Sequence, residues 1–181
     1  LEGDNSFYDF SGFSKAVSYL KENNIFDSYD CITLTNETLL TNLPTEHIYY
    51  NVNNDLFNNI CTNKNAVSGL LDSHGFEFTI HDRKINKWLR GNFIAMNLNV
   101  LKKINYKIQY FDLLSIYDDK NNFKINISCN YLDKINLWLS HDKYKDIHSD
   151  NIIKNKKIAS IINEAYLSSV LMDFEVYKFD R

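Results

Sequence analysis

Polar side chains that could bind a ligand follow two apolar segments of this chain. Residues 31–34 form a short apolar or β-branched run that leads into Asn36 and Glu37, and residues 66–71 form an apolar run that leads into Asp72. Buried strands of parallel sheets are near-continuously apolar, and ligands of open α/β sheets collect beyond the carboxyl ends of such strands. We therefore expect Asn36, Glu37 and Asp72 to lie around one cleft. The alternative is that they form polar turns after core strands.

These residue types suit metal-assisted group transfer. Hard cations such as Mg²⁺ prefer oxygen ligands, so Glu37 could hold a cation with support from the amide oxygen of Asn36. A carboxylate such as Asp72 or Glu164 could accept the proton of an attacking hydroxyl group. Each acid also has a simpler explanation, because Glu164 fits the solvated face of a helix and Asp72 fits a turn or a helix cap.

The histidines do not predict a metal site. In an extended segment His74 shares a face with Phe76 and Phe78, whereas His81 lies on the opposite face. His141 and His148, in the carboxyl-terminal half, fall in a charged segment and are expected to be solvated. The chain also lacks the glycine-rich phosphate loops, the GxSxG motif and the HExxH motif of well-known enzyme classes.

Composition narrows the class of protein further. The 181 residues fit one domain, and a net charge of −3 lacks the basic excess that extensive phosphate contacts require, so we do not expect a nucleic-acid partner. No apolar run is long enough for a membrane-spanning helix. Three cysteines far apart in the sequence favour reduced thiols in the cytoplasm over a disulfide framework.

Hydrophobic periodicity predicts the elements that must position these residues. Phe13, Ala16, Val17 and Leu20 form one stripe of an amphipathic helix, and residues 151–172 form the longest helix. Together with 31–34 and 66–71, residues 93–96 are expected to form buried strands. We predict a single α/β domain over residues 1–181, with three layers and a mainly parallel sheet flanked by helices.

Five segments carry a resemblance to a known family. They are Asn5-Ser6-Phe7-Tyr8-Asp9-Phe10, residues 29–38, Ser68-Gly69-Leu70-Leu71-Asp72-Ser73, residues 88–97 and residues 162–168. Their order resembles that of the bacterial rhamnan-synthesis-type glycosyltransferases, which build polysaccharides and have a GT-A-like nucleotide-sugar fold. The sequence departs from the family pattern at Phe7, which replaces a glycine, at Glu37-Thr38, which replace Asp-Ser, and at Arg90-Gly91, which replace Gln-Ser.

The resemblance implies a role for each of these segments. Asn5, Asp9 and Asn36 would bind the nucleotide-sugar donor, with Asn5 or Asp9 on the rim of the cleft, and Glu37 would hold Mg²⁺ or Mn²⁺. The first strand and the base-binding loop of a GT-A fold would precede Asn5, so the chain is either a fragment or a domain that lacks the amino-terminal half of the donor site.

The acceptor side follows in the same way. Asp72 and Glu164 would be catalytic, and Trp88 and Arg90 would face a carbohydrate acceptor. The resemblance implies sugar transfer to a surface polysaccharide or glycan of the cell envelope, in the cytoplasm or at the inner face of the cytoplasmic membrane. Two alternatives stay open: a non-catalytic carbohydrate-binding or subunit-interaction domain on the same scaffold, and an unrelated small α/β enzyme such as a phosphotransferase.

Overall fold

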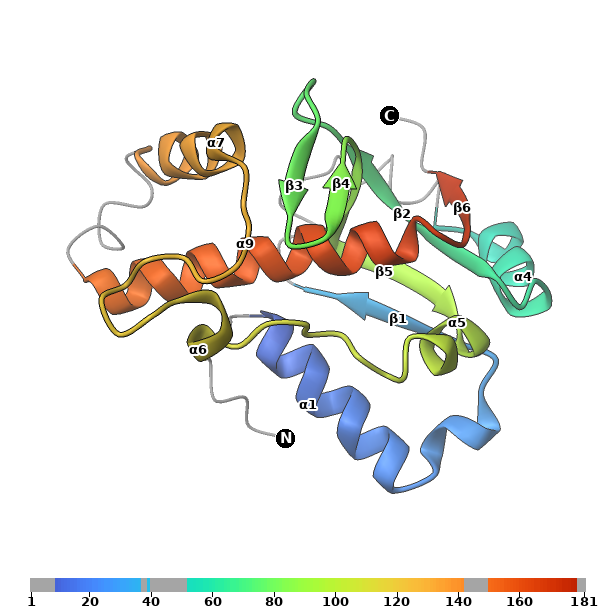
Figure 1. Cartoon of the computed structure of the whole chain (residues 1–181). Coiled ribbons are helices and arrows are strands. Elements are labelled where there is room, and N and C mark those ends of the chain that lie inside the picture. Colours follow the sequence, from blue (N-terminus) through green and yellow to red (C-terminus); the bar gives the residue numbers. More distant parts are fainter. Residues whose placement is uncertain (1–8, 37–38, 40–51, 142–149, 179–181) are drawn as a thin grey trace.

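The computed structural model describes residues 9–36, 39, 52–141 and 150–178. Its helices and strands, in chain order, are α1 (Asp9–Glu22), the 3₁₀ helix η1 (Ile25–Ser28), β1 (Cys31–Thr35), α4 (Asn54–Thr62), β2 (Ala66–Asp72), β3 (Phe78–Ile80), β4 (Arg83–Ile85), β5 (Trp88–Asn97), α5 (Leu98–Lys103), α6 (Leu113–Ile116), α7 (Cys129–Leu139), α9 (Asn151–Leu171) and β6 (Glu175–Lys178). The chain is a mixed α/β protein (Figure 1).

Strand β5 lies at the centre of a four-stranded sheet with the order β1-β5-β2-β6. The three strands predicted from sequence do share one sheet, but the prediction of a mainly parallel sheet is wrong. β5 runs antiparallel to β1 and to β2, and the one parallel pair is β2 with β6.

The connections explain this difference. Parallel neighbours need a crossover of a dozen or more residues, usually a helix. The segment between β2 and β5 instead folds as the β3–β4 hairpin, so the chain returns to the sheet in the opposite direction. The parallel β6 follows the long helix α9, which supplies the required crossover. An apolar run thus indicates a buried central strand without fixing its direction.

Helices cover both faces of the sheet, which is why β5 is apolar along both sides. Ile94 and Met96 of β5 belong to the core formed with α1 and α9. Phe93 and Ala95 belong to a smaller core formed with α4 on the other face. In Figure 1 the long helix α9 runs across the sheet, and α4 lies beside β2.

The predicted helices agree well with the structure. α1 buries Phe10 and Val17, and α9 covers nearly all of the predicted range 151–172. Asp150 caps α9, because its side chain accepts hydrogen bonds from the backbone amides of Ile152 and Ile153. Phe123, Ile125 and Ile127 alternate with polar residues, a pattern typical of a half-buried strand, but the structure has only isolated bridges at Phe123 and Ile127.

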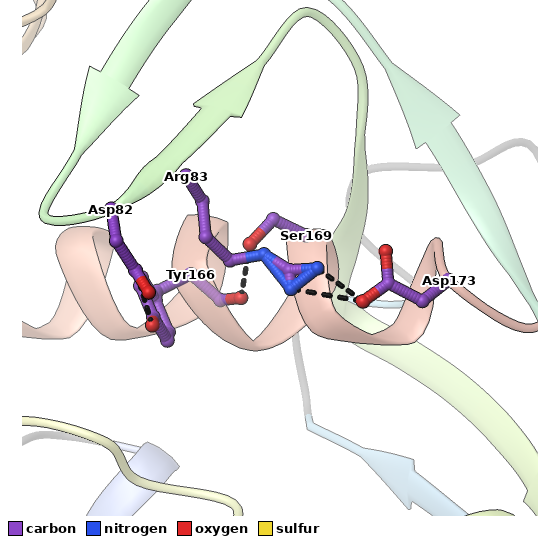
Figure 2. Close-up of polar contacts among 5 residues, drawn as sticks. All are labelled: Asp82, Arg83, Tyr166, Ser169 and Asp173. Carbon is purple, nitrogen blue, oxygen red and sulfur yellow. Dashed lines mark hydrogen bonds and ion pairs between the residues drawn. The ribbon is translucent and has the colours of Figure 1, made fainter.

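The β3–β4 hairpin is fastened to α9 by polar contacts (Figure 2). The Tyr166 hydroxyl donates a hydrogen bond to Asp82 Oδ1 at 2.8 Å. Arg83 Nη1 donates to Asp173 Oδ2 at 2.9 Å, and the two side chains form an ion pair. These contacts fix the hairpin whose two ends continue into β2 and β5.

Asn163 anchors the segment before α6 to the buried face of α9. Its side chain is 0% exposed. Its Oδ1 accepts from the backbone amides of Tyr110 and Phe111 at 2.8 and 2.9 Å, and its Nδ2 donates to Phe111 O at 3.0 Å and to Ala159 O at 2.9 Å. One buried amide therefore satisfies backbone groups of Tyr110 and Phe111, which belong to no strand or helix.

Replacing Asn163 should be strongly destabilising. Asn163→Ala leaves several buried backbone groups without partners, at a cost of roughly 1–3 kcal/mol for each unsatisfied group. We expect the free energy of unfolding, measured by urea titration, to fall by about 3 kcal/mol. Asn136→Ala, which removes an exposed amide from α7, should change it by less than about 0.5 kcal/mol. A loss below about 1 kcal/mol for Asn163→Ala would contradict the anchoring role.

Candidate functional site

A pocket of about 500 Å³ opens where β1 and β2 end. We call it the central pocket. Residues from α1, β2, β5, α7 and α9 contribute to it, together with residues that flank the strands. Its lining residues are Phe10, Asn36, Asp72, His74, Trp88, Arg90, Gly91, Asn92, Tyr131, Lys134, Ile135, Trp138, Lys157, Ser160, Ile161, Glu164 and Ala165.

An irregularity in β5 creates one wall of the central pocket. The β2–β5 register passes from the pair Gly69 and Ile94 to the pair Leu71 and Leu89, so residues 90–93 lie opposite Leu70 alone. The extra residues bend the strand and bring positions 90–92 to the pocket. The bend also brings the backbone very close to Gly69, where a Cβ atom would lie 2.8 Å from Phe93 O.

Asn36 reaches the pocket through contacts with the same part of β5. The backbone amide of Asn36 and the Thr35 hydroxyl both donate to Asn92 O, at 3.4 and 3.1 Å. The Asn92 side chain is only 7% exposed, and its Oδ1 has no hydrogen-bond partner among the described residues. A buried amide oxygen without a partner is costly. A hydroxyl or amino group of a ligand in the pocket could donate the hydrogen bond that Asn92 Oδ1 lacks.

Asp72 and Arg90 form a half-buried ion pair in the central pocket. Arg90 Nε donates to Asp72 Oδ2 at 2.6 Å, and Arg90 Nη2 contacts the same oxygen. Asp72 Oδ1 accepts from the backbone amide of Ser73 at 2.8 Å. Both carboxylate oxygens therefore already have donors, and the main effect of Asp72 is to hold the guanidinium group in place.

Glu164 faces the pocket from α9 and also supports β5. Its Oε1 accepts a hydrogen bond from the backbone amide of Gly91 at 2.6 Å. A Cβ atom at position 91 would lie 3.3 Å from Cδ and Cγ of Glu164, so the glycine permits this close approach. The simpler explanation of Glu164 as a solvated acid on a helix face is wrong, since the side chain is half-buried and bonded to β5.

Aromatic rings form the apolar part of the pocket. The His74 ring lies 4.3 Å from the Trp88 ring and 5.7 Å from the Tyr131 ring, measured between centroids. Phe78 stacks on Tyr131 at 3.9 Å. Lys157 Nζ lies 5.7 Å from the centroid of the Trp138 ring, so a second tryptophan carries a cation at its face.

The electrostatic environment keeps His74 neutral. Burial lowers the pKa of His74 from 6.5, and nearby Lys134 lowers it further, while Asp72 acts in the opposite direction. Burial, with a smaller contribution from Glu164, raises the pKa of Tyr131 far above its ordinary value. Both rings are therefore uncharged near neutral pH and can present apolar faces to a ligand.

The structure brings five residues singled out from the sequence to the central pocket: Asn36, Asp72, Trp88, Arg90 and Glu164. Asn5 and Glu37 lie outside the described residues, and Asp9 begins α1 with its side chain outside them. The sequence analysis missed His74, Tyr131, Lys134 and Trp138 as lining residues. The alternation that places His74 on the face of Phe76 and Phe78 is confirmed by their ring contacts, and it was the one available signal.

The described residues do not form a site that fits the Mg²⁺ or Mn²⁺ ion implied by the resemblance. Within residues 9–36, 39, 52–141 and 150–178 no group of three or more His, Cys, Asp or Glu side chains could hold a metal ion. Asp72, the carboxylate at the end of β2, is committed to Arg90 and Ser73.

Comparison of the chain with protein-family models, curated proteins and solved structures gives no match. None of the helices in the described part of the chain combines the length and the apolar character needed to cross a bilayer.

Acidification should destabilise the protein through His74. Because its pKa is lower in the folded state than the ordinary value of 6.5, the unfolded chain binds a proton first as the pH falls. The stabilising contribution is therefore present above pH 6.5 and is lost as the pH falls below it. We expect the free energy of unfolding to drop less between about pH 7.5 and about pH 5.5 in His74→Phe than in the wild type.

The exposed His141 gives a control for this experiment. His141→Gln should retain the wild-type change in the free energy of unfolding over the same pH interval. An equal change in wild type and His74→Phe would show that His74 does not couple protonation to folding.

Proposed function

We propose that the central pocket binds a carbohydrate and that the chain is a glycosyltransferase that acts there. The observation that carries this proposal is the convergence of aromatic rings with amide and carboxylate groups in a pocket of about 500 Å³. Small-molecule sites are concave, mostly apolar and contain a few placed polar groups. A sugar ring combines an apolar C–H face with a rim of hydroxyl groups, and it matches both parts of this lining.

Trp88 and Trp138 supply the surfaces on which a sugar ring could stack. Asn36 and Asn92 supply amide groups for the hydroxyl rim, and the buried Oδ1 of Asn92 still lacks a hydrogen-bond donor among the described residues. The resemblance implies donor-binding, catalytic or acceptor-side roles for several residues. Five of them have side chains that the structure describes, and all five line this pocket. This agreement favours a polysaccharide-building glycosyltransferase over an unrelated small α/β enzyme.

Charge in the pocket is compatible with a nucleotide-sugar donor. Arg90, Lys134 and Lys157 line it from three different elements. A departing diphosphate carries negative charge that fixed cations can stabilise. Asp72 binds Arg90 Nε and thereby holds the guanidinium group in place.

Glu164 is the better of the two proposed catalytic carboxylates. Asp72 is the less suitable proton acceptor, because both of its carboxylate oxygens already accept hydrogen bonds, one from Arg90 and the other from the backbone amide of Ser73. Glu164 is bonded at Oε1 to a neutral backbone amide. In this proposal Glu164 accepts the proton of the acceptor hydroxyl group, and Asp72 positions Arg90.

We also propose a GT-A-like three-layer architecture, on the basis of the same family resemblance. The helices on both faces of a mixed sheet agree with the α/β class, and the four-stranded sheet does not by itself specify a GT-A fold. We propose that transfer to a cell-envelope glycan takes place in the cytoplasm or at the inner surface of the membrane.

The second candidate is a domain that binds carbohydrate without catalysis. The engagement of both Asp72 oxygens favours it, because one of the two expected catalytic acids serves a structural purpose. Binding and transfer must therefore be measured separately.

Glu164→Gln separates the two functions. The glutamine keeps an oxygen that can accept a hydrogen bond from Gly91 N, so the fold should be unchanged. The sugar affinity, measured by calorimetry with an oligosaccharide panel, should change by less than about threefold. The side chain can no longer take a proton, so transfer from a nucleotide-sugar, measured as released nucleoside diphosphate, should fall by about 100-fold or more.

Two matched variants complete the assay. Glu77→Gln, at an exposed acid whose partner Lys84 is 3.6 Å away, should leave both binding and transfer unchanged. Trp88→Ala should reduce sugar affinity at least about tenfold. Sugar binding by a wild-type protein without any transfer would select the second candidate, and absence of sugar binding would refute both.

The divalent cation proposed at Glu37 has its own test. Glu37 lies outside the described residues, so this proposal rests on the resemblance alone. We expect Glu37→Gln to weaken Mn²⁺ binding at least about tenfold in calorimetry, because the variant lacks the charged oxygen ligand. The melting temperature should stay within about 1 °C of the wild type. Unchanged Mn²⁺ affinity would remove Glu37 from the site, and a large loss of stability would identify it as a structural acid.

A further inference from the structure

Two cysteines far apart in the sequence lie in contact on the side of the sheet away from the central pocket. Cys31 begins β1, and Cys61 lies in the last turn of α4. Their Sγ atoms are 3.3 Å apart, and both residues are half-buried. Cys31 packs at the edge of the small core under α4. The third cysteine, Cys129, is exposed at the start of α7.

Asn97 holds the two cysteines together. The register of the sheet places Asn97 directly opposite Cys31 on β5. The Asn97 Nδ2 donates to Ile60 O at 2.9 Å and to Cys61 O at 3.1 Å, which fixes the end of α4 over the start of β1. The Asn97 side chain is buried and also caps α5. The proximity of the two thiols therefore follows from strand pairing and a buried amide.

We infer that Cys31 and Cys61 form an oxidative modification site that closes to a disulfide when the protein meets a hydroperoxide. An S–S bond is about 2.0 Å long, so the sulfur atoms must approach by little more than 1 Å, which small side-chain rotations provide. The inference is independent of the proposed glycosyltransferase activity.

The reaction balances as two steps. A thiolate of the pair attacks one peroxide oxygen, the O–O bond breaks, and the cysteine becomes a sulfenic acid while the peroxide leaves as water or an alcohol. The second thiol loses its proton, attacks the sulfenic sulfur and expels water, so the S–S bond forms. Two thiols are oxidised by two electrons in all, and one peroxide is reduced. A small dithiol such as dithiothreitol reverses the reaction by thiol–disulfide exchange.

Burial assigns Cys31 to the second step of this reaction, in which it loses its proton as it attacks the sulfenic sulfur of Cys61. Burial, together with the contact to Cys61, raises the pKa of Cys31 to about 11. Cys31 is therefore a protonated thiol near neutral pH, and two negative charges do not meet at 3.3 Å. Both residues are half-buried and neither is fully enclosed, so a small peroxide can approach the pair.

The disulfide would tie α4 to β1 and close a covalent loop around the segment that includes Asn36. Asn36 lines the central pocket at the other end of β1. A closed loop of this length restricts the unfolded chain, so the oxidised protein should be the more stable form.

The test is oxidation of the full chain by hydrogen peroxide, followed by peptide mapping without reduction. In the folded protein we expect the peptides of Cys31 and Cys61 to be linked, with a mass about 2 Da below the sum of the free peptides. This link should exceed any link to Cys129 by at least about tenfold. Dithiothreitol should restore three free thiols, and the oxidised form should melt about 5 °C or more above the reduced form.

Cysteine variants and the unfolded chain supply the controls. Cys129→Ser should retain the link and the rise in melting temperature, whereas Cys31→Ser and Cys61→Ser should lose both. In guanidinium chloride the three possible pairings should all form. Oxidation of Cys129 without the Cys31–Cys61 link in the folded protein, or the same mixture of links in folded and unfolded chains, would overturn the inference.

Discussion

The central constraint in this protein is that buried backbone amides of β5 must find hydrogen-bond partners where its pairing with β2 is interrupted. Residues 90–93 lie opposite a single residue of β2, and buried amides are almost always paired in folded proteins. Helix α9 supplies acceptors within this interruption and beside it. The Ser168 hydroxyl accepts from Leu89 N, and one turn earlier Glu164 Oε1 accepts from Gly91 N. The two acceptors are four residues apart, so they lie on one face of the helix.

This constraint shapes the central pocket. The residues that bend β5 away from β2 include Arg90 and Asn92, which line the pocket together with Glu164. The polar side chains of the site therefore also stabilise the sheet, and the site cannot be altered freely. A carboxylate that bonds to β5 is held in one position relative to the aromatic rings, as a binding or catalytic group requires.

The two faces of the sheet serve different purposes. On the face covered by α1 and α9, polar groups interrupt the core and border the central pocket. On the face covered by α4, a small apolar core and the amide of Asn97 bring two thiols into contact. Strand β1 joins these regions, with Cys31 at its beginning and Asn36 after its end.

The local elements of this fold follow from short-range patterns in the sequence. Apolar runs located β1, β2 and the buried part of β5, and helical periodicity located α1 and α9, because these patterns depend on neighbours a few residues apart. The polar residues after the strands could also be selected from their positions, and Asn36, Asp72, Trp88, Arg90 and Glu164 do line one pocket.

The way in which these elements combine depends instead on contacts between distant parts of the chain. Strand direction depends on the connection between strands, so the hairpin between β2 and β5 replaced the expected parallel pair by an antiparallel one. Three features of the site depend on residues that are not neighbours in the sequence. They are the bend in β5, the ion pair of Asp72 with Arg90 and the ring contact of His74 with Trp88. Hydrophobic periodicity is a property of short segments and does not predict such contacts. They form only after the strands of the sheet have paired and α9 has packed against it.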